Sequence, residues 1–381
     1  MKFTFTEEQV LVRDSAREFL TAHAGSAQLR QAMSLPRGYD PKVWRSVTLD
    51  LGWTGVALPE SVGGSGLGMV ELGIVLEEMG RCLYGGPYLA STGFASALLL
   101  ESPVTTYRDN LLTKIARGEC ICAVAFTDDT GLAGARAVNV KLDADGITLS
   151  GHASFVLSGN VADYFIVVVL DTRNEKSELI LAVVDAAASG LFIEPLIAMD
   201  LTRPYARLQF KSVIPAAFLT QASAGEVERG IQIAQIALAA EQLGSMQGIM
   251  DITTEYTRQR VQFGRSIGSF QAIKHRLADM LVICEAARSA AYYAICVVDE
   301  YRSGTASEQE LAEAAALVKA YCSSSFHEVA GHAIQLHGGI GFTWEHDAHL
   351  YFKRARATSN LLGSPQYHHE RIAVLIGLNM L

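Results

Sequence analysis

The spacing of hydrophobic residues changes twice along this chain of 381 residues. Residues 7–20 and 69–79 repeat apolar side chains every three or four positions, which predicts amphipathic helices. Residues 120–220 instead contain short apolar or alternating runs bounded by turn residues, a pattern typical of strands. From about residue 225 the helical spacing returns. The pattern therefore predicts a small β domain between two helical regions.

The predicted fold is mainly α with an inserted β domain. We expect three units, namely an N-terminal helical domain at 1–117, a middle β-barrel domain at 118–222 and a C-terminal four-helix bundle at 223–381. Within the last unit, long apolar-periodic stretches at 226–262, 270–301 and 307–332 predict long helices. Their short connections indicate an antiparallel bundle.

Charge and composition exclude several classes of protein. A net charge of -9 argues against nucleic-acid binding by bulk electrostatics. The N-terminus lacks the apolar core of a signal peptide, and the apolar runs are short and interrupted by glycine or charge. We therefore expect a cytoplasmic protein that does not contact a membrane. Six scattered cysteines indicate reduced thiols rather than a disulfide framework.

Two segments of the C-terminal region carry chemistry. The first, residues 256–280 (YTRQRVQFGRSIGSFQAIKHRLADM), places arginine, glutamine and phenylalanine directly before a glycine. The second, residues 335–345 (QLHGGIGFTWE), places a glutamine three residues before a glycine pair. Arginine offers a pyrophosphate a planar, permanently charged pair of donors, and glycines let backbone N–H groups approach an anion closely. Residues of these types are therefore suited to bind a pyrophosphate group.

These motifs and the order of the three domains resemble the acyl-CoA dehydrogenase family along the whole chain. The resemblance implies an FAD between the β domain and the bundle, with its adenosine and pyrophosphate end held by a neighbouring subunit. The residues it implies at that end are Arg260, Gln262, Phe263, Gln335, Gly338 and Gly339, and those implied near the flavin ring are Phe126 and Thr127. It also implies α,β-dehydrogenation of an acyl-CoA thioester, with electrons passed to an electron-transfer flavoprotein.

The catalytic base of that family is missing at both of its known places. The family's usual Glu lies about twenty residues after the GGxGF motif, and this position is Leu362 here. The isovaleryl type places its Glu on the first bundle helix, at the position of Ala234. Neither side chain can accept a proton.

Glu241 is the remaining acidic candidate on the first bundle helix. It lies two turns beyond Ala234, among small and apolar helical neighbours, so burial is expected to raise its pKa. However, two turns are about 10 Å along the helix axis, more than a side chain can span. We therefore favour a structural Glu241 that is paired with an arginine or a backbone donor.

The predicted flavin-ring side also departs from the family pattern. The loop at 127–134 lacks most of the family's residues, and Phe155-Val156-Leu157 replaces a Trp-Ile-Thr segment that packs against the ring. The half that serves a neighbour's FAD is retained. This asymmetry resembles the subunit without a base in α2β2 members that act on CoA-linked steroid side chains. The alternatives are a self-sufficient homo-oligomeric dehydrogenase that uses Glu241 and a flavin-free structural or regulatory subunit.

Two further patterns are expected to be structural. His327, His332 and His337 are spaced by five residues, so successive rings lie about 140° apart on a helix. No metal site is therefore expected. The glycine-rich segment 63–68 is expected to form a turn between helices rather than a phosphate cradle, because no strand precedes it.

Overall fold

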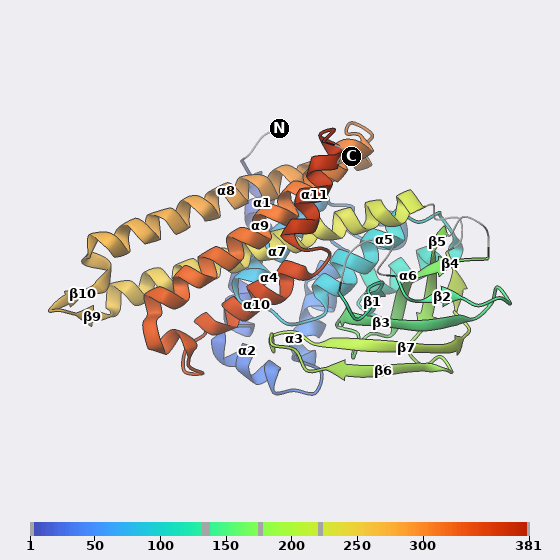
Figure 1. Ribbon diagram of the computed structural model, residues 1–381, viewed down its shortest axis with the longest axis horizontal. Helices are drawn as coiled ribbons and strands as arrows, with labels where there is room; N and C mark the ends of the chain where they lie inside the picture. Colours follow the sequence, from blue (N-terminus) through green and yellow to red (C-terminus); the bar gives the residue numbers. More distant parts are fainter. Residues whose placement is uncertain (1–3, 132–137, 174–177, 220–223, 379–381) are drawn as a thin grey trace.

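The computed structural model describes residues 4–131, 138–173, 178–219 and 224–378. It confirms the predicted order of an N-terminal helical region, a β domain and a C-terminal helical bundle (Figure 1). Three predicted features lie partly outside the described residues: the loop to Gly134, the start of a strand at Ala137 and the boundary at residue 222.

The N-terminal region is helical from Glu7 to Ala116. Its α-helices are α1 (Glu7–His23), α2 (Ser26–Met33), α3 (Pro41–Arg45), α4 (Met69–Arg81), α5 (Ser96–Glu101) and α6 (Thr106–Ala116), with shorter turns η1 (Ser46–Asp50), η2 (Trp53–Gly55), η3 (Glu60–Val62) and η4 (Leu89–Ala95) between them. Thr6 begins α1 because its side chain and that of Gln9 cap each other's backbone N–H groups. The glycine-rich segment is a turn, as predicted. A Cβ on Gly64 would lie 2.1 Å from the Leu58 carbonyl oxygen, so only glycine fits.

The β domain is built on one eight-stranded sheet. Its strands are β1 (Cys122–Ala125), β2 (Lys141–Leu142), β3 (Leu149–Leu157), β4 (Tyr164–Asp171), β5 (Glu178–Asp185), β6 (Leu191–Leu196), β7 (Tyr205–Val213) and β8 (Ala217–Phe218). The order is β6-β7-β3-β2-β4-β5-β8, and β1 pairs with β4 in parallel. The strand predicted at 146–151 begins later and runs on to Leu157. Strand β3 stays paired with β7 although the pairing register shifts between Ala153 and Val156.

The C-terminal region consists of three long helices and two shorter ones. In chain order its elements are α7 (Ala224–Gln259), β9 (Val261–Gln262), β10 (Arg265–Ser266), η6 (Ile267–Ser269), α8 (Gln271–Arg302), α9 (Glu308–His337), η7 (Gly338–Phe342), α10 (Ala348–Asn360) and α11 (Pro365–Leu375). The helix predicted to reach residue 262 ends at Gln259, because the short β9–β10 hairpin begins at Val261. Figure 1 shows this hairpin at the end of the bundle remote from the β domain.

Helix α8 differs from the sequence-based expectation about apolar stretches. By length and composition it is apolar enough to cross a membrane, so the prediction that no such stretch exists was wrong. In the structure α8 packs against α4, α7 and α9 as a helix of the bundle. Its other face remains uncovered: Val282 is 69% exposed, and Leu281 and Tyr293 are also exposed.

Candidate cofactor and acyl sites

The predicted pyrophosphate contacts lie at the tip of the bundle. Arg260 immediately follows α7, and Gln262 and Phe263 belong to the β9–β10 hairpin, where all three are exposed. Phe263 is 90% exposed and has a φ of 52°. Both features are unfavourable for a phenylalanine, and strained backbone of this kind is often found where a ligand or partner binds. The tip is therefore a candidate contact surface.

The second predicted motif lies at the same end of the molecule. Gln335 is exposed near the C-terminal end of α9, and Gly338 and Gly339 are exposed at the start of η7. Gly338 has a φ of 61°, and a Cβ added to either glycine would meet no atom within 4 Å. The Gly338 N–H already donates to the carbonyls of Ile334 and Gln335, but the absence of side chains lets an anion approach the backbone at Gly339, which fits the pyrophosphate part of FAD.

A direct contact joins the two motifs. The Tyr256 hydroxyl near the end of α7 donates a hydrogen bond to the backbone carbonyl of His337, 3.3 Å away. The two rings are stacked with their centroids 4.4 Å apart. The structure thus joins the two segments that carry the predicted adenosine and pyrophosphate contacts through Tyr256 and His337.

The predicted ring-side residues lie elsewhere. Phe126 and Thr127 follow β1 in the β domain, at the opposite end of the bundle from the hairpin (Figure 1), and both are buried. Helix α8 has 32 residues, which corresponds to about 48 Å. The two groups of predicted cofactor contacts are therefore not brought together within one chain.

Hydrogen bonds within the protein also fix the ring-side loop. The Thr127 hydroxyl donates to the Ser154 carbonyl at 2.8 Å, so its proton is already used. Asp129 accepts from the Ser154 hydroxyl at 2.5 Å and lies 2.8 Å from Arg207 Nη2, contacts that hold the pKa of Asp129 below its usual value. Phe155, at the family's tryptophan position, is 44% exposed. These residues fit a flavin ring less well than the bundle tip fits the pyrophosphate.

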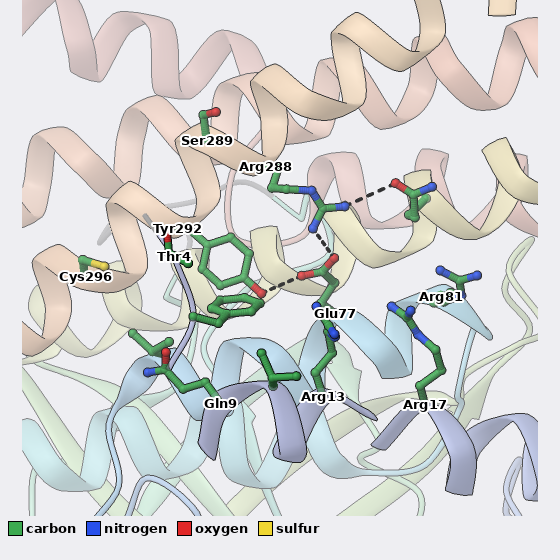
Figure 2. A pocket seen from close by; sticks show the side chains of 14 residues that line it. Thr4, Gln9, Arg13, Arg17, Glu77, Arg81, Arg288, Ser289, Tyr292 and Cys296 are labelled. Carbon is green, nitrogen blue, oxygen red and sulfur yellow. Dashed lines mark hydrogen bonds and ion pairs between the residues drawn. The ribbon is translucent and has the colours of Figure 1, made fainter. Parts of the chain in front are cut away.

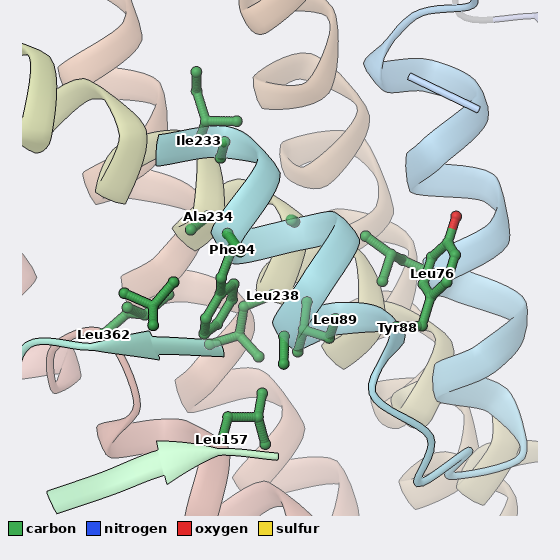
Figure 3. Close-up of a cluster of buried hydrophobic side chains, with 14 of the residues drawn as sticks. Leu76, Tyr88, Leu89, Phe94, Leu157, Ile233, Ala234, Leu238 and Leu362 are labelled. Atoms are coloured by element: carbon green, nitrogen blue, oxygen red, sulfur yellow. The ribbon is translucent and has the colours of Figure 1, made fainter. Parts of the chain in front are cut away.

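Both vacant base positions belong to one buried apolar cluster. Figure 3 shows Leu362 and Ala234 among side chains from four parts of the chain. The other labelled members are Leu76, Tyr88, Leu89, Phe94, Leu157, Ile233 and Leu238. Leu362 is 4% exposed and Ala234 3%. The cavity that borders Leu89, Leu157 and Glu241 measures only about 10 Å³, room for no more than one water molecule. An acyl chain does not fit there.

The turn that carries Leu362 is fixed by side chains from three helices. Its carbonyl accepts hydrogen bonds from Gln235 Nε2 and His368 Nε2, each at 3.0 Å. The next carbonyl, that of Gly363, accepts from Lys319 Nζ at 2.9 Å. Lys319 is fully buried, and this burial lowers its pKa to about 7. Leu362 itself has a φ of 61°, which these contacts maintain.

Glu241 lies in a buried ionic network. Its carboxylate is 2.6 Å from Arg354 Nη1 and is also paired with Arg203. Arg354 is in turn 2.9 Å from Asp200. The prediction of a structural Glu241 paired with an arginine is confirmed, because Arg203 from the segment before β7 and Arg354 from α10 both reach the buried carboxylate. Burial lowers the pKa of Arg203 to about 10.

Sequence reasoning missed the residues that organise both sites. Lys319, Arg354 and His337 carry no motif that distinguishes them from exposed basic residues. Their burial becomes visible only when helices distant in sequence are packed together. The one available signal was the position of His337 directly before the predicted glycine pair.

A separate cavity of about 760 Å³ lies between α1, α4, α7 and α8 (Figure 2). Four arginines line it, namely Arg13, Arg17, Arg81 and Arg288. Each is paired with a carboxylate, as in the contact of Arg288 with Glu77 at 2.5 Å, and Glu77 also accepts from the Tyr292 hydroxyl. The arginine charges are therefore compensated within the protein, and this cavity is not a strong anion site.

Comparison with known proteins agrees with the fold and the motifs. Residues 6–119 match the N-terminal domain of acyl-CoA dehydrogenases, and residues 226–376 match the C-terminal domain. The chain is 35% identical to the acyl-CoA dehydrogenase IpdE2 of Mycobacterium tuberculosis over 94% of each chain. Among solved structures, a variant of the Tcur3481–Tcur3483 steroid ACAD is 30% identical with a TM-score of 0.85 over 98% of each chain. The ChsE4–ChsE5 complex from Mycobacterium tuberculosis is 26% identical with a TM-score of 0.88 over all of each chain.

The fold and the bundle-tip motifs define a flavoprotein oxidoreductase of the CH–CH class. More specifically, the chain belongs to the acyl-CoA dehydrogenase family, whose members bind FAD and oxidise acyl-CoA thioesters.

Proposed function

We propose that this chain is the subunit without a catalytic base in a heteromeric, FAD-dependent acyl-CoA dehydrogenase of the cytoplasm. Its bundle tip holds the adenosine and pyrophosphate end of an FAD whose ring lies in the partner subunit. The partner supplies the carboxylate that removes the α-proton. Electrons then pass to an electron-transfer flavoprotein.

The observation that carries this proposal is the closed apolar cluster around Leu362 and Ala234. A dehydrogenase needs a base within hydrogen-bond reach of the α-carbon and space for the acyl chain. In this chain both base positions are apolar, and the neighbouring cavity holds about 10 Å³. The exposed hairpin and glycine turn at the other end of the bundle have no such obstruction. The chain is therefore suited to contribute cofactor contacts to another subunit's active site rather than to catalyse the reaction in a site of its own.

The proposed role of each bundle-tip residue follows from its chemistry. The Arg260 guanidinium binds the pyrophosphate with charged, paired N–H donors. The Gly338–Gly339 turn adds the backbone N–H of Gly339, and the Gln262 and Gln335 amides supply neutral hydrogen bonds that orient the adenosine end. When bound, FAD supplies the two-electron oxidising capacity that no side chain of this protein has.

The relatives support a second, different subunit as the partner. Two similar structures are described as a ChsE4–ChsE5 complex and as a Tcur3481–Tcur3483 steroid ACAD, each naming two components. The exposed apolar face of α8, with Val282, Leu281 and Tyr293, offers a surface for such a contact. From the same relatives we propose a CoA thioester of a steroid-derived side chain as the substrate class.

Flavin content measured with and without the partner tests this function. The chain should be produced alone and together with a base-bearing acyl-CoA dehydrogenase subunit encoded nearby. We expect little FAD in the isolated chain and about one FAD per heterodimer in the complex, which should be reduced by an acyl-CoA. A yellow homo-oligomer that an acyl-CoA bleaches without any partner would rule the proposal out.

The Glu241 alternative has a structural obstacle. As a base, Glu241 would have to leave Arg354 and Arg203 and reach past the closed cluster. If the chain is a flavin-free structural subunit, replacing Arg260 should leave the flavin content of the complex unchanged. The variants Glu241→Gln and Arg260→Ala separate these alternatives from the proposed function.

A further inference from the structure

Three aromatic rings form one cluster beside the glycine turn. Tyr256 of α7 stacks on His337 at the end of α9, with centroids 4.4 Å apart and planes inclined by 26°. His337 in turn contacts His346, just before α10, at 4.3 Å. The cluster thus joins the end of α7 to the segment from His337 to His346, and Tyr256 and His337 are 81 positions apart. It lies directly against Gly338, the first residue of the exposed turn.

His337 is held by one hydrogen bond from its ring and one to its backbone carbonyl. Its ring Nδ1 lies 2.7 Å from the Ala333 carbonyl oxygen, so Nδ1 carries the proton and donates. Its own carbonyl accepts from the Tyr256 hydroxyl. The ring is 3% exposed, and Nε2 has no partner among the described residues. Burial lowers its pKa to about 4, so the ring is neutral near neutral pH.

Tyr256 links this cluster to the arginine of the other motif. Its backbone carbonyl accepts from the Arg260 N–H at 2.8 Å, and the Arg260 carbonyl accepts from the Ile267 N–H at 2.8 Å. One residue therefore contacts the glycine turn through its side chain and the root of the hairpin through its backbone. Moving the Tyr256 ring would change the distance between the two motifs.

We propose that Tyr256 and His337 are positioning residues that set the separation of Arg260 from the Gly338–Gly339 turn. The inference rests on the proposed function, because it concerns the geometry of the same cofactor end. Neither side chain needs to touch the cofactor. The hydroxyl of Tyr256 and the Nδ1–H of His337 act by fixing the backbone that carries the binding groups. His346 packs against both rings, tilted by 49° to His337 and edge-on to Tyr256.

The test uses the co-produced complex and measures its dissociation constant for FAD. Tyr256→Phe keeps the ring and removes one hydrogen bond, so we expect FAD binding to weaken about 3- to 10-fold. Tyr301→Phe is the matched control, because it removes a hydrogen bond of the same 3.3 Å length at the other end of α8. The control should leave the dissociation constant unchanged. If Tyr256→Phe also leaves it unchanged, the positioning role is wrong.

A double-mutant cycle separates positioning from general stabilisation. If Tyr256 acts through Arg260, Tyr256→Phe should have little further effect in an Arg260→Ala background. Fully additive losses would overturn the proposal, as would a lower melting temperature of the flavin-free complex with no change in FAD affinity. His337→Gln should retain part of the FAD affinity that His337→Ala loses, because the glutamine amide can still donate a hydrogen bond to the Ala333 carbonyl. A wild-type complex that binds no FAD at all would refute the proposed function itself, a result distinct from unchanged binding by the variant.

Discussion

Lys319 Nζ donates a hydrogen bond to the Gly363 carbonyl oxygen, 2.9 Å away, one residue after the leucine that stands where the family places its base. The same ammonium contacts the Ser323 hydroxyl and the Ser359 carbonyl at the end of α10. It is fully buried, and its hydrogen-bond partners among the described residues are all neutral oxygens. A buried lysine in this environment makes the stability of the turn depend on its protonation.

Lys319→Met should remove a pH dependence of stability in the alkaline range. The pKa of Lys319 is lowered from 10.5 to about 7 in the folded state, so between these values the unfolded chain binds more protons. The free energy of unfolding of the wild type therefore gains from this group as pH rises from about 7 to 10.5, by up to about 1.4 kcal/mol per pH unit. Denaturant unfolding at pH 7 and pH 10 should show a smaller rise in the free energy of unfolding for the variant than for the wild type. Lys42→Met, at an exposed position, should leave the rise intact.

Leu362→Gly should be no less stable than Leu362→Ala. Both variants lose the buried side chain, at about 2–5 kcal/mol for the alanine. The φ of 61° costs a non-glycine residue about 1 kcal/mol, and glycine relieves this strain. Leu336 inside α9 is the control, since there glycine should be about 1 kcal/mol worse than alanine. The same penalty for glycine at both positions would contradict the strain at Leu362.

Glu241→Gln should destabilise the protein rather than abolish turnover in a stable enzyme. Removing the carboxylate charge leaves Arg203 buried without its counter-ion, at a cost of about 3 kcal/mol. Thermal unfolding of the flavin-free chain measures this loss. Glu328→Gln on the exposed face of α9 should change little. If Glu241→Gln instead gave a fully stable complex that binds flavin without being reduced by substrate, Glu241 would be the base after all.

Arg260→Ala should release FAD from the heteromeric complex. A charged hydrogen bond contributes about 1.5–3 kcal/mol, which corresponds to an FAD dissociation constant about 10- to 100-fold higher. The absorbance ratio of flavin to protein after gel filtration measures the loss. Arg258→Ala is the matched control, because Arg258 lies two residues away and its side chain is 73% exposed. Equal flavin content in both variants would remove Arg260 from the cofactor site.

Periodicity and breakers predicted the long helices because these properties are local. The stretches later seen as α7, α8 and α9 contain few breakers and end near glycines. Strands β6 and β7 were missed: β6 has no fully buried residue and contains Pro195, so it has no clear apolar run. The extension of β3 to Leu157 depends on pairing with β7, which no local pattern reveals.

In the candidate sites, too, local sequence patterns predicted some features, whereas contacts between distant residues could not be predicted. The family resemblance predicted that Leu362 and Ala234 occupy the base positions, and this prediction needed only counting along the motifs. The ion pairs of Glu241 join residues 38 and 113 positions apart, and the contact of Tyr256 with His337 spans 81 positions. Such contacts follow from helix packing, so they could be found only in the folded structure.

The placement of the predicted flavin-ring and pyrophosphate residues at opposite ends of the bundle has a consequence for handling the protein. A cofactor shared between two chains is released when the chains separate, so its occupancy follows mass action in protein as well as in FAD. Dilution of the complex should therefore lower the amount of FAD bound per protein chain even when free FAD is held constant, and added partner subunit should raise it again. For this protein, cofactor retention would report on subunit association.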